Sequence, residues 1–257
     1  MKTVICDMDD TLCESCRPIS FDMAEVITKL VNKGFTFVVI GGSDLHHIKE
    51  QVCDQLKVPI FVLANSGSKM YKWTGAGLEF LHQVRFTSAK KAKVFCALDN
   101  LRRKYSLIPE TSYDDQVQDR GTQITISILG RHADFKHKAA YDPDKVKRKR
   151  FVEFLARRLK GFSLTIGGTS SIDITPASVT KGTCLRNFIN KQGINKKDCL
   201  FLGDGLFPGG NDWSVKGVVS AFKVDGVGHT LKFLNRLDSG DVVGLSGLDM
   251  GGVWYPL

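Results

Sequence analysis

The stretch Lys2-Thr3-Val4-Ile5-Cys6-Asp7-Met8-Asp9-Asp10-Thr11-Leu12 decides the fold of this chain. Its apolar run predicts a short buried β-strand over residues 2–6, which stops at Asp7. Asp9 follows two residues later, where a turn begins. Two carboxylates this close repel each other, and a divalent cation with oxygen ligands offsets the repulsion. Asp7 therefore suits a nucleophile beside an acid–base Asp9, although a polar turn after a strand is an alternative interpretation.

Outward from this strand, apolar strands alternate with amphipathic helices. Helices are predicted at residues 21–33, 44–57 and 181–192, and further strands at residues 35–40, 60–64, 199–202 and 218–224. Strands that alternate with helices predict a parallel sheet covered by helices on both sides. The predicted fold class is therefore α/β, with a Rossmann-like doubly wound parallel sheet as its core.

The middle of the chain follows a different pattern. A helix is predicted at residues 88–105, a sheet with one wet face at residues 123–129, a basic helix from Pro143 to about Lys160, and strands at residues 162–166 and 172–174. These elements predict an α+β cap of residues 82–176, inserted into a Rossmann-like catalytic core of residues 1–81 and 177–257. The tail from Asp238 to Leu257 is rich in glycine and supports no prediction.

The composition is that of a folded protein. The chain has 257 residues, of which 42% are hydrophobic, enough for a sizeable core. We expect no membrane partner, because no apolar stretch is long enough to span a bilayer. We expect a cytoplasmic location, because the N-terminal residues enter a strand at once and lack the apolar region of a signal peptide. The seven scattered cysteines are interpreted as reduced thiols, with a metal or redox pair at Cys13 and Cys16 as an alternative.

The net charge of +9 is concentrated in the middle of the chain. Residues 82–176 contain 19 Lys and Arg against 10 Asp and Glu, whereas the rest of the chain contains 17 of each kind. A local positive field attracts anions, so phosphorylated metabolites and nucleic acids are both candidate partners. The run Lys145-Val146-Lys147-Arg148-Lys149-Arg150 is typical of a solvated helix face. Since no aromatic stacking platform accompanies this run, the sequence does not favour nucleic acid as a partner.

Three further element ends carry groups that suit phosphoryl chemistry. Gly42-Ser43 follows the second strand and offers a backbone N–H and a hydroxyl to a phosphate oxygen. Lys181 opens a helix, where its ammonium and the free N–H groups favour an anion. Gly203-Asp204 follows a late strand and precedes Pro208-Gly209-Gly210-Asn211-Asp212, which adds oxygen ligands for a cation. Each feature alone is usually structural, but ligands bind beyond the carboxyl ends of parallel strands, so together they predict one site.

These motifs resemble those of the haloacid-dehalogenase-like phosphotransferases. The resemblance rests on Asp7-x-Asp9-x-Thr11, Ser43, Lys181 and Gly203-Asp204 with Asn211-Asp212, and it covers nearly the whole chain except the tail. The insertion between the second and third motifs is similar to the cap of the Cof-type branch. Within that branch the chain looks most like eukaryotic-type phosphomannomutases and related microbial sugar phosphatases, through Pro208-Gly209-Gly210-Asn211-Asp212, Arg120-Gly121-x-Gln123, Gly130-Arg131 and Gly167-Gly168-x-x-Ser171-Ile172-Asp173.

The resemblance implies how the phosphoryl group is handled. Asp7 would be the nucleophile that forms an aspartyl-phosphate. Asp9 would protonate the leaving sugar oxygen and then deprotonate the acceptor. Ser43, the backbone of Gly42 and Lys181 would hold the transferring phosphoryl group. The chemistry agrees, because phosphoryl transfer depends mostly on positioning and charge neutralisation.

The resemblance also implies a magnesium ion. Asp7, the carbonyl of Asp9 and Asp204 would hold it, with Asn211 or Asp212 in or just behind the ligand shell. Carboxylate and carbonyl oxygens are the ligands that this hard cation prefers. The expected cofactor is therefore Mg²⁺.

In the cap, the resemblance implies a substrate site. Arg120 and Arg131 match positions that grip the far phosphate of the substrate, a task that guanidinium groups suit. Ordinary surface arginines beside a strand are the alternative interpretation. Ser171 and Asp173 match positions that contact sugar hydroxyls. The cap is expected to close over the substrate and exclude water.

Several positions outside these motifs also bear on the substrate. Arg17, just after the first motif, matches another substrate arginine of the family. Asp10 stands where glycine is usual, and Cys13 replaces a threonine. Lys138 stands where the mutases have a further arginine, and a lysine lacks the bidentate grip. The phosphate grip of the cap is therefore expected to be weaker or differently tuned.

The expected function is Mg²⁺-dependent phosphoryl transfer from a small hexose phosphate. If water accepts the phosphoryl group, the enzyme is a phosphatase, and Lys138 favours this interpretation. If a sugar hydroxyl accepts it, the enzyme is a mutase of the phosphomannomutase type, which Arg120 and Arg131 favour. We prefer the phosphatase. A non-catalytic phosphosugar sensor is another class, but the intact Asp9 and Lys181 argue against it. The oligomeric state stays open, with a homodimer as one alternative.

Overall fold

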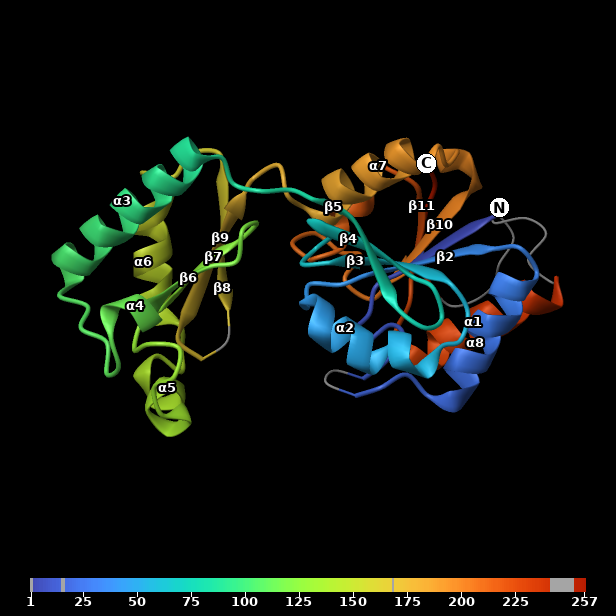
Figure 1. Cartoon of the computed structure of the whole chain (residues 1–257), viewed down its shortest axis with the longest axis horizontal. Helices are drawn as coiled ribbons and strands as arrows, with labels where there is room; N and C mark the ends of the chain where they lie inside the picture. The colour runs from blue at the N-terminus through green and yellow to red at the C-terminus, as the bar shows by residue number, and fades with distance from the viewer. Residues whose placement is uncertain (1, 15–16, 168, 241–251) are drawn as a thin grey trace. The chain divides into compact units, whose positions relative to one another are not determined.

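The computed structural model describes residues 2–14, 17–167, 169–240 and 252–257 (Figure 1). The chain divides into two compact units, a core unit of residues 1–83 and 180–257 and an inserted unit of residues 84–179. The limits therefore lie at 83/84 and 179/180, whereas we expected 81/82 and 176/177. Cys16, Gly168 and residues 241–251 of the tail lie outside the described residues. The described cysteines are free thiols.

The core unit is built on an eight-stranded sheet in the order β12-β11-β10-β1-β2-β3-β4-β5. Its strands are β1 (Thr3–Cys6), β2 (Thr36–Ile40), β3 (Ile60–Ala64), β4 (Lys69–Trp73), β5 (Leu78–Gln83), β10 (Cys199–Gly203), β11 (Ser220–Lys223) and β12 (Trp254–Tyr255). The pairs from β11 through β10, β1 and β2 to β3 are parallel, and the outer pairs are antiparallel. The central strand β1 therefore lies between β10 and β2.

Helices cover both faces of this sheet. On one face pack α1 (Phe21–Asn32), α2 (Leu45–Gln51) and α8 (Val227–Ser239), and on the other packs α7 (Lys181–Gln192). Alternate side chains of β1 serve the two cores, because Val4 and Cys6 join the first cluster and Ile5 joins the second. Among the described residues of the core unit, three short 3₁₀ helices lie between these elements: η1 (Cys53–Gln55), η2 (Lys196–Asp198) and η3 (Trp213–Val215). The predicted doubly wound α/β core is confirmed.

The inserted unit is an α+β layer with two unlike sheet faces. Its four-stranded antiparallel sheet has the order β6-β7-β9-β8. The elements are α3 (Ser88–Tyr105), α4 (Tyr113–Gln116), β6 (Val117–Asp119), β7 (Ile124–Ser127), α5 (Phe135–Tyr141), α6 (Val146–Ala156), β8 (Phe162–Gly167) and β9 (Ser171–Pro176). Ile124, Ile126, Ile172 and Ile174 form one core with apolar side chains of α3 and α6. The alternate residues of the same strands make the other face polar.

Two helices end or begin at other residues than predicted, because hydrogen bonds from outside the helix engage the carbonyl or the N–H groups at these ends. The helix predicted over residues 44–57 stops at Gln51, whose carbonyl accepts the N–H of Ile19 at 2.9 Å, and the chain continues as η1. The basic helix runs from Val146 to Ala156, and not from Pro143 to about Lys160. The carboxylate of Asp142 accepts the N–H groups of Lys147 and Arg148 at 2.9 and 3.0 Å and so caps this later start.

The hairpin of β4 and β5 and helix α8 were not predicted from the sequence. Strand β4 buries Met70 and Trp73 and leaves the two residues between them half-buried, so its side chains lack the strict alternation that predicts a strand. The turn after β4 needs glycine at Gly75, where φ is +92° and a Cβ atom would lie 2.4 Å from the Lys57 carbonyl oxygen. Helix α8 buries Phe233, Leu234 and Leu237 at helical spacing, a signal that lies just before the glycine-rich tail.

Candidate active site

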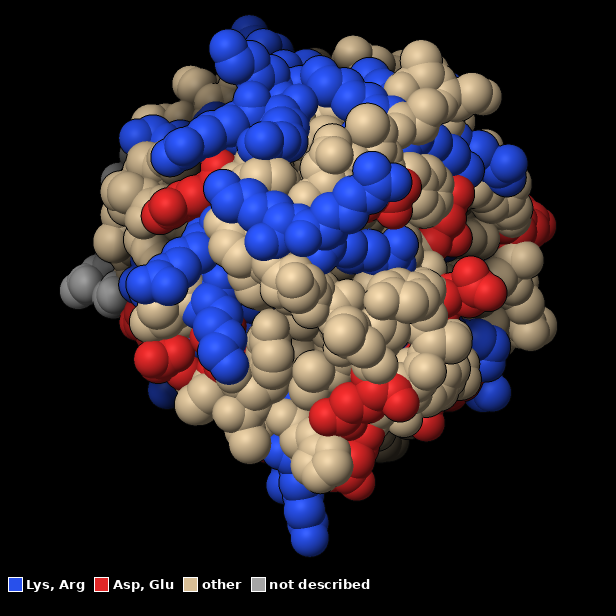
Figure 2. Space-filling model, turned by 90° about the vertical axis from the view of Figure 1, so that its left-hand side faces the viewer, with Lys and Arg blue, Asp and Glu red and all other residues tan. Residues whose placement is uncertain are grey.

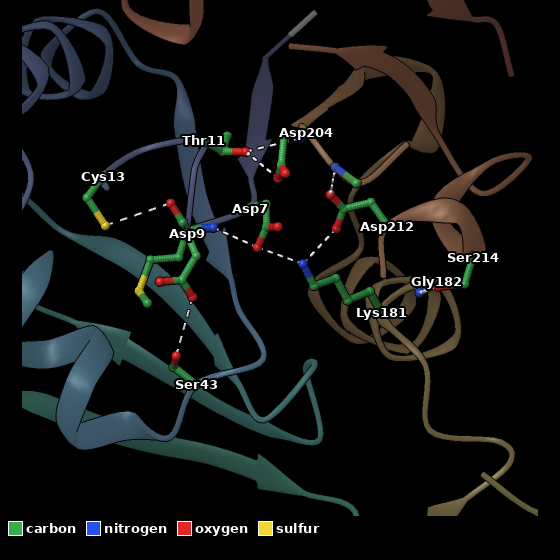
Figure 3. A network of polar contacts seen from close by, with 12 residues as sticks. Asp7, Asp9, Thr11, Cys13, Ser43, Lys181, Gly182, Asp204, Asp212 and Ser214 are labelled. Atoms are coloured by element: carbon green, nitrogen blue, oxygen red, sulfur yellow. Dashed lines mark hydrogen bonds and ion pairs between the residues drawn. The ribbon is translucent and has the colours of Figure 1, made fainter. Parts of the chain in front are cut away.

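The candidate site lies at one end of the core sheet, where neighbouring parallel strands stop. Asp7 follows β1, Ser43 follows β2, and Asp204 follows β10. Because β1 pairs with β10 on one side and with β2 on the other, these three side chains come from adjacent strand ends. Lys181 is the first residue of α7. The close-up in Figure 3 shows these residues facing one another.

Lys181 forms the centre of the site. Its ammonium lies 2.6 Å from Oδ1 of Asp7 and 2.6 Å from Oδ1 of Asp212 (Figure 3). The three side chains are buried, with at most 2% of each residue exposed. Burial alone lowers the pKa of Lys181, but the charges of Asp7 and Asp212 outweigh burial and raise this pKa above its usual value. Lys181 is therefore a fixed positive charge between two acids.

Glycines hold Asp212 in place. Its Oδ2 accepts the backbone N–H of Gly205 at 3.1 Å, while its Oδ1 faces Lys181. A Cβ atom on Gly203 would lie 2.4 Å from Oδ2 of Asp212, so only glycine allows this approach of the carboxylate. Burial raises the pKa of Asp212 above its usual value, against the opposing effect of Lys181. Both oxygens of Asp212 are thus already hydrogen-bonded within the protein.

Asp9 is less confined than Asp7. It is half-buried, and Oδ2 accepts the Ser43 hydroxyl at 3.5 Å (Figure 3). The following residue, Asp10, has a φ of +55° and turns the chain back, so that its N–H donates to the carbonyl of Cys13 at 2.8 Å. Burial first, and then the charge of Asp7, raises the pKa of Asp9 above its usual value. A carboxyl with a raised pKa beside an open side of the site can hold and release a proton.

The acids of this site suit a divalent cation. Carboxylate oxygens of Asp7, Asp204 and Asp212 all lie within 4.8 Å of one another. Burial and then the charge of Asp7 raise the pKa of Asp204, because the negative charge of Asp204 is repelled by Asp7. Hard cations take such oxygen donors, and their charge offsets the repulsion. The donor set therefore fits a metal ion.

Thr11 was predicted as part of the first motif without being given a role, and Gly182 and Ser214, which also shape this site, were missed. The hydroxyl of Thr11 is fully buried, donates to Oδ1 of Asp204 at 3.3 Å and accepts its N–H at 3.2 Å, so Thr11 orients this acid. Ser214 in η3 accepts the N–H of Gly182 at 3.0 Å. A Cβ on Gly182 would lie 1.8 Å from the Ser214 carbonyl oxygen. The first turn of α7, which carries Lys181, is thus locked against η3, and no sequence spacing signals this contact.

The other residues of the core unit that the sequence placed in or beside the site make fewer contacts with its charged groups. Arg17 is exposed, and its nearest acid is Glu14 at 3.5 Å. A Cβ on Gly42 would meet no atom within 4 Å, so space for a ligand remains beside its backbone. Asn211 is exposed, and its Oδ1 lies against Gly205. The thiol of Cys13 is buried and 3.7 Å from Oε1 of Gln51.

Ser171 and Asp173 lie on the polar face of the inserted unit. They are two residues apart on β9, opposite Ser127 and Thr125 of β7. The Thr125 hydroxyl donates to Oδ1 of Asp173 at 2.7 Å, and the hydroxyls of Ser127 and Ser171 are 3.3 Å apart. The neighbouring strand therefore orders both side chains, as a hydrogen-bonding surface for polyols requires.

Of the basic residues predicted for the substrate on the inserted unit, Arg120 and Arg131 are exposed and Lys138 is half-buried. Arg120 donates from Nη2 to Oε1 of Gln118 at 3.0 Å. The backbone of Arg131 is held on both sides, because its N–H donates to the carbonyl of Asp115 at 3.1 Å and its own carbonyl accepts Nζ of Lys138 at 2.9 Å. Lys138 is thus engaged with the backbone of the residue that it was expected to assist.

The chain is similar in sequence and in fold to proteins of one known family. A family model described as haloacid dehalogenase-like hydrolase matches residues 4–213. Phosphomannomutase 2 of Dictyostelium discoideum is 29% identical over 245 residues, which are 91% of this chain and 96% of that protein. The phosphomannomutase of Saccharomyces cerevisiae is 29% identical over 226 residues, covering 82% of this chain and 84% of that protein. The crystal structure of a haloacid dehalogenase-like hydrolase from Bacteroides thetaiotaomicron shares the fold, with a TM-score of 0.61 at 14% identity over 85% of each chain.

Proposed function

Because the chain belongs to the haloacid dehalogenase-like hydrolase family, we propose that it transfers the phosphoryl group of a small hexose phosphate to Asp7 and then to water. The observation that carries this proposal is the ammonium of Lys181 at 2.6 Å from Asp7, with Asp9, Ser43 and Asp204 around the same strand ends. The site combines a nucleophile, a proton carrier and positive charge, which are the parts that phosphoryl transfer needs.

In the first half of the reaction, an oxygen of Asp7 attacks phosphorus. The bond from phosphorus to the sugar oxygen breaks, and Asp9 gives its proton to that leaving oxygen. The raised pKa of Asp9 supports this role, since the carboxyl must arrive protonated. Lys181 and the Ser43 hydroxyl position the oxygens of the phosphoryl group, and Lys181 offsets their charge.

In the second half, Asp9 takes a proton from the acceptor. The acceptor oxygen then attacks phosphorus, the bond from phosphorus to Asp7 breaks, and Asp7 regains its carboxylate. With water as the acceptor the product is inorganic phosphate, and the enzyme is a phosphatase. The same carboxyl therefore acts first as acid and then as base.

Mg²⁺ is the cofactor that we propose for the acidic cluster. Asp7, the carbonyl of Asp9 and Asp204 would hold it. Because both oxygens of Asp212 already accept donors from the protein, we place Asp212 just behind the ligand shell, with Asn211 beside it. The ion, when bound, neutralises charge on the phosphoryl group and on the nucleophile.

The inserted unit would select the substrate. Ser171 and Asp173 would contact sugar hydroxyls through the ordered polar face of β7 and β9, while Arg120 and Arg131 would bind a second anionic group, with Arg17 of the core unit as a further contact. Support for a phosphosugar comes from the two relatives quoted above, both phosphomannomutases.

A hexose-phosphate mutase is the second candidate. It is favoured by those relatives and by the exposed guanidinium groups of Arg120 and Arg131, which suit a second phosphate. The phosphatase is favoured by Lys138, whose ammonium is held by the Arg131 carbonyl at 2.9 Å. A mutase must bind a bisphosphate in both orientations, and this engagement weakens the distal grip.

One assay separates the two candidates. The protein is incubated with Mg²⁺ and mannose 1-phosphate, with and without a hexose bisphosphate primer, and both free phosphate and mannose 6-phosphate are measured. We expect free phosphate with or without the primer. Primer-dependent formation of the 6-phosphate without free phosphate would assign the mutase, and a screen of other sugar phosphates then defines the substrate.

A further inference from the structure

Two neighbouring helices of the inserted unit form a strongly basic surface. Helix α3 and residues 145–160, which contain α6, carry 14 Lys and Arg against only Asp99 and Glu153. The helices pack against each other through Tyr105 and Phe151, whose rings are 4.9 Å apart. Figure 2 shows Lys and Arg gathered in a band across the upper half of the face turned to the viewer. We call this surface the basic face.

Most of these cations are exposed. Lys91 pairs with Asp119, Arg102 with Asp99, and Arg148 is buried against Asp142. The exposed remainder are Lys90, Lys93, Arg103, Lys104, Lys145, Lys147, Lys149, Arg150, Arg157, Arg158 and Lys160. Like charges at this density repel one another and weaken the folded unit, and an anionic partner relieves that repulsion.

The proposed chemistry of the protein does not account for the basic face. Within the inserted unit, Ser171 and Asp173 lie on the polar face of the sheet, whereas α3 and α6 cover the opposite, apolar face. The cations of the helices therefore point away from the side of the sheet assigned to the sugar. The run at residues 145–150 alone is typical of a solvated helix face, and it is the second basic helix beside it that extends the charge over a broad surface.

Aromatic rings hold several of the cations in place. The guanidinium of Arg158 lies 3.7 Å from the Phe154 ring centre, and Lys104 lies 5.1 Å from the same ring. Lys93 lies over the ring of Phe162 at 5.9 Å. Such contacts reduce the motion that the cations lose on binding. The Phe154 ring is buried beneath Arg158 and Lys104, so it offers no open face on which an unpaired base could stack.

From these observations we propose that the basic face binds duplex nucleic acid through its backbone phosphates. A duplex presents closely spaced negative charges and needs no base stacking, which matches fixed cations over covered rings. An anionic membrane fits less well, since among the described residues of α3 and α6 only Phe95 and Val146 are exposed large apolar side chains. The proposal is independent of the phosphatase activity.

The test measures binding of the full-length protein to a labelled duplex of about 20 base pairs by fluorescence anisotropy, at salt concentrations from about 50 to 200 mM. Two charge reversals probe the two helices separately, Lys149→Glu with Arg150→Glu on α6 and Lys90→Glu with Arg103→Glu on α3. We expect each pair to weaken binding about tenfold and to reduce the slope of log affinity against log salt by about two.

A matched control places the same reversal elsewhere. Lys196→Glu with Lys197→Glu changes two exposed lysines of η2 in the core unit and should leave duplex binding within about twofold. All variants should keep the melting temperature and the far-ultraviolet circular dichroism of the parent protein, which shows that both units fold. The proposal is overturned if the duplex does not bind at the lowest salt, if the α3 pair has no effect, or if the control weakens binding equally. Tighter binding to anionic phospholipid vesicles or to a single strand also overturns it.

Discussion

In the core unit, Lys181 is buried between two carboxylates, whereas in the inserted unit Arg131 is exposed and only its backbone is held. In the core site, Asp7, Lys181 and Asp212 are fixed by one another before any substrate arrives. In the inserted unit, the exposed side chain of Arg131 extends from this fixed backbone towards solvent. Reaction chemistry requires fixed charges, while recognition of different sugars tolerates adaptable ones.

The largest effect is expected when the nucleophile of the core unit is changed. Asp7→Asn should reduce phosphate release from every substrate by on the order of 10⁵-fold, because the amide cannot form the phosphoryl ester. The measurement is release of phosphate from an aryl phosphate and from a hexose phosphate, with thermal melting as the fold control. Turnover that survives in a folded variant would exclude Asp7 as the nucleophile.

Removal of divalent cations tests the acidic cluster of the core. EDTA should lower turnover by about 10³-fold on all substrates, and Mg²⁺ should restore it, since the charge on the nucleophile and the phosphoryl group is no longer offset. Calcium, which is larger, serves as the matched control and should not restore full activity. Activity that is indifferent to EDTA would contradict the assignment of Asp7 and Asp204 as ligands.

The exposed side of the comparison is tested by Arg131→Ala. It should reduce kcat/KM for hexose phosphates about 100-fold and leave aryl phosphate hydrolysis nearly unchanged, because on our proposal Arg131 binds an anionic group of the sugar substrate that an aryl phosphate lacks. Arg131→Lys is the matched variant, which keeps the charge and loses the bidentate grip. Equal losses on both substrates would contradict a role in selecting the sugar.

The smallest effect concerns the support of Arg131. Asp115 accepts the Thr111 hydroxyl at 2.7 Å and the His132 N–H at 2.9 Å, and its pKa is lowered to about 2, chiefly by that N–H. A lowered pKa adds stability above the usual value near 3.8, and this stability is lost as the pH falls towards about 2. In melting scans, Asp115→Asn should be a few degrees less stable at about pH 6, and the difference should shrink towards about pH 2. A difference in melting temperature that stays constant between about pH 6 and about pH 2 would contradict the lowered pKa of Asp115.

Sequence reasoning captured the parts of the fold that repeat a period. Strands β1, β3 and β10 and helices α3 and α7 are nearly as predicted, since their apolar spacing reflects direct burial. It failed where long-range contacts decide. Helix α2 ends early because the N–H of the distant Ile19 donates to the carbonyl of Gln51. Strand β12 has only two residues, which is too short for a periodic pattern.

For the candidate site, the sequence predicted the charged groups but not their supports. Asp7, Lys181 and Asp204 stand at element ends, where functional side chains are expected, and the structure brings them together. Thr11 and Ser214 act through hydrogen bonds to partners far along the chain, at 193 and 32 positions of separation. Thr11 belongs to a local motif, but its contact with Asp204, like that of Ser214 with Gly182, is visible only when the strands are assembled.

The placement of Lys181 has a consequence for how the protein matures. Its ammonium already satisfies Asp7 and Asp212, so the polypeptide can acquire its native conformation before any metal is captured. On the proposal that Asp7 and Asp204 bind Mg²⁺, the ion would enter a site that is already folded. A protein kept without the ion would then stay intact and regain turnover when the ion is added.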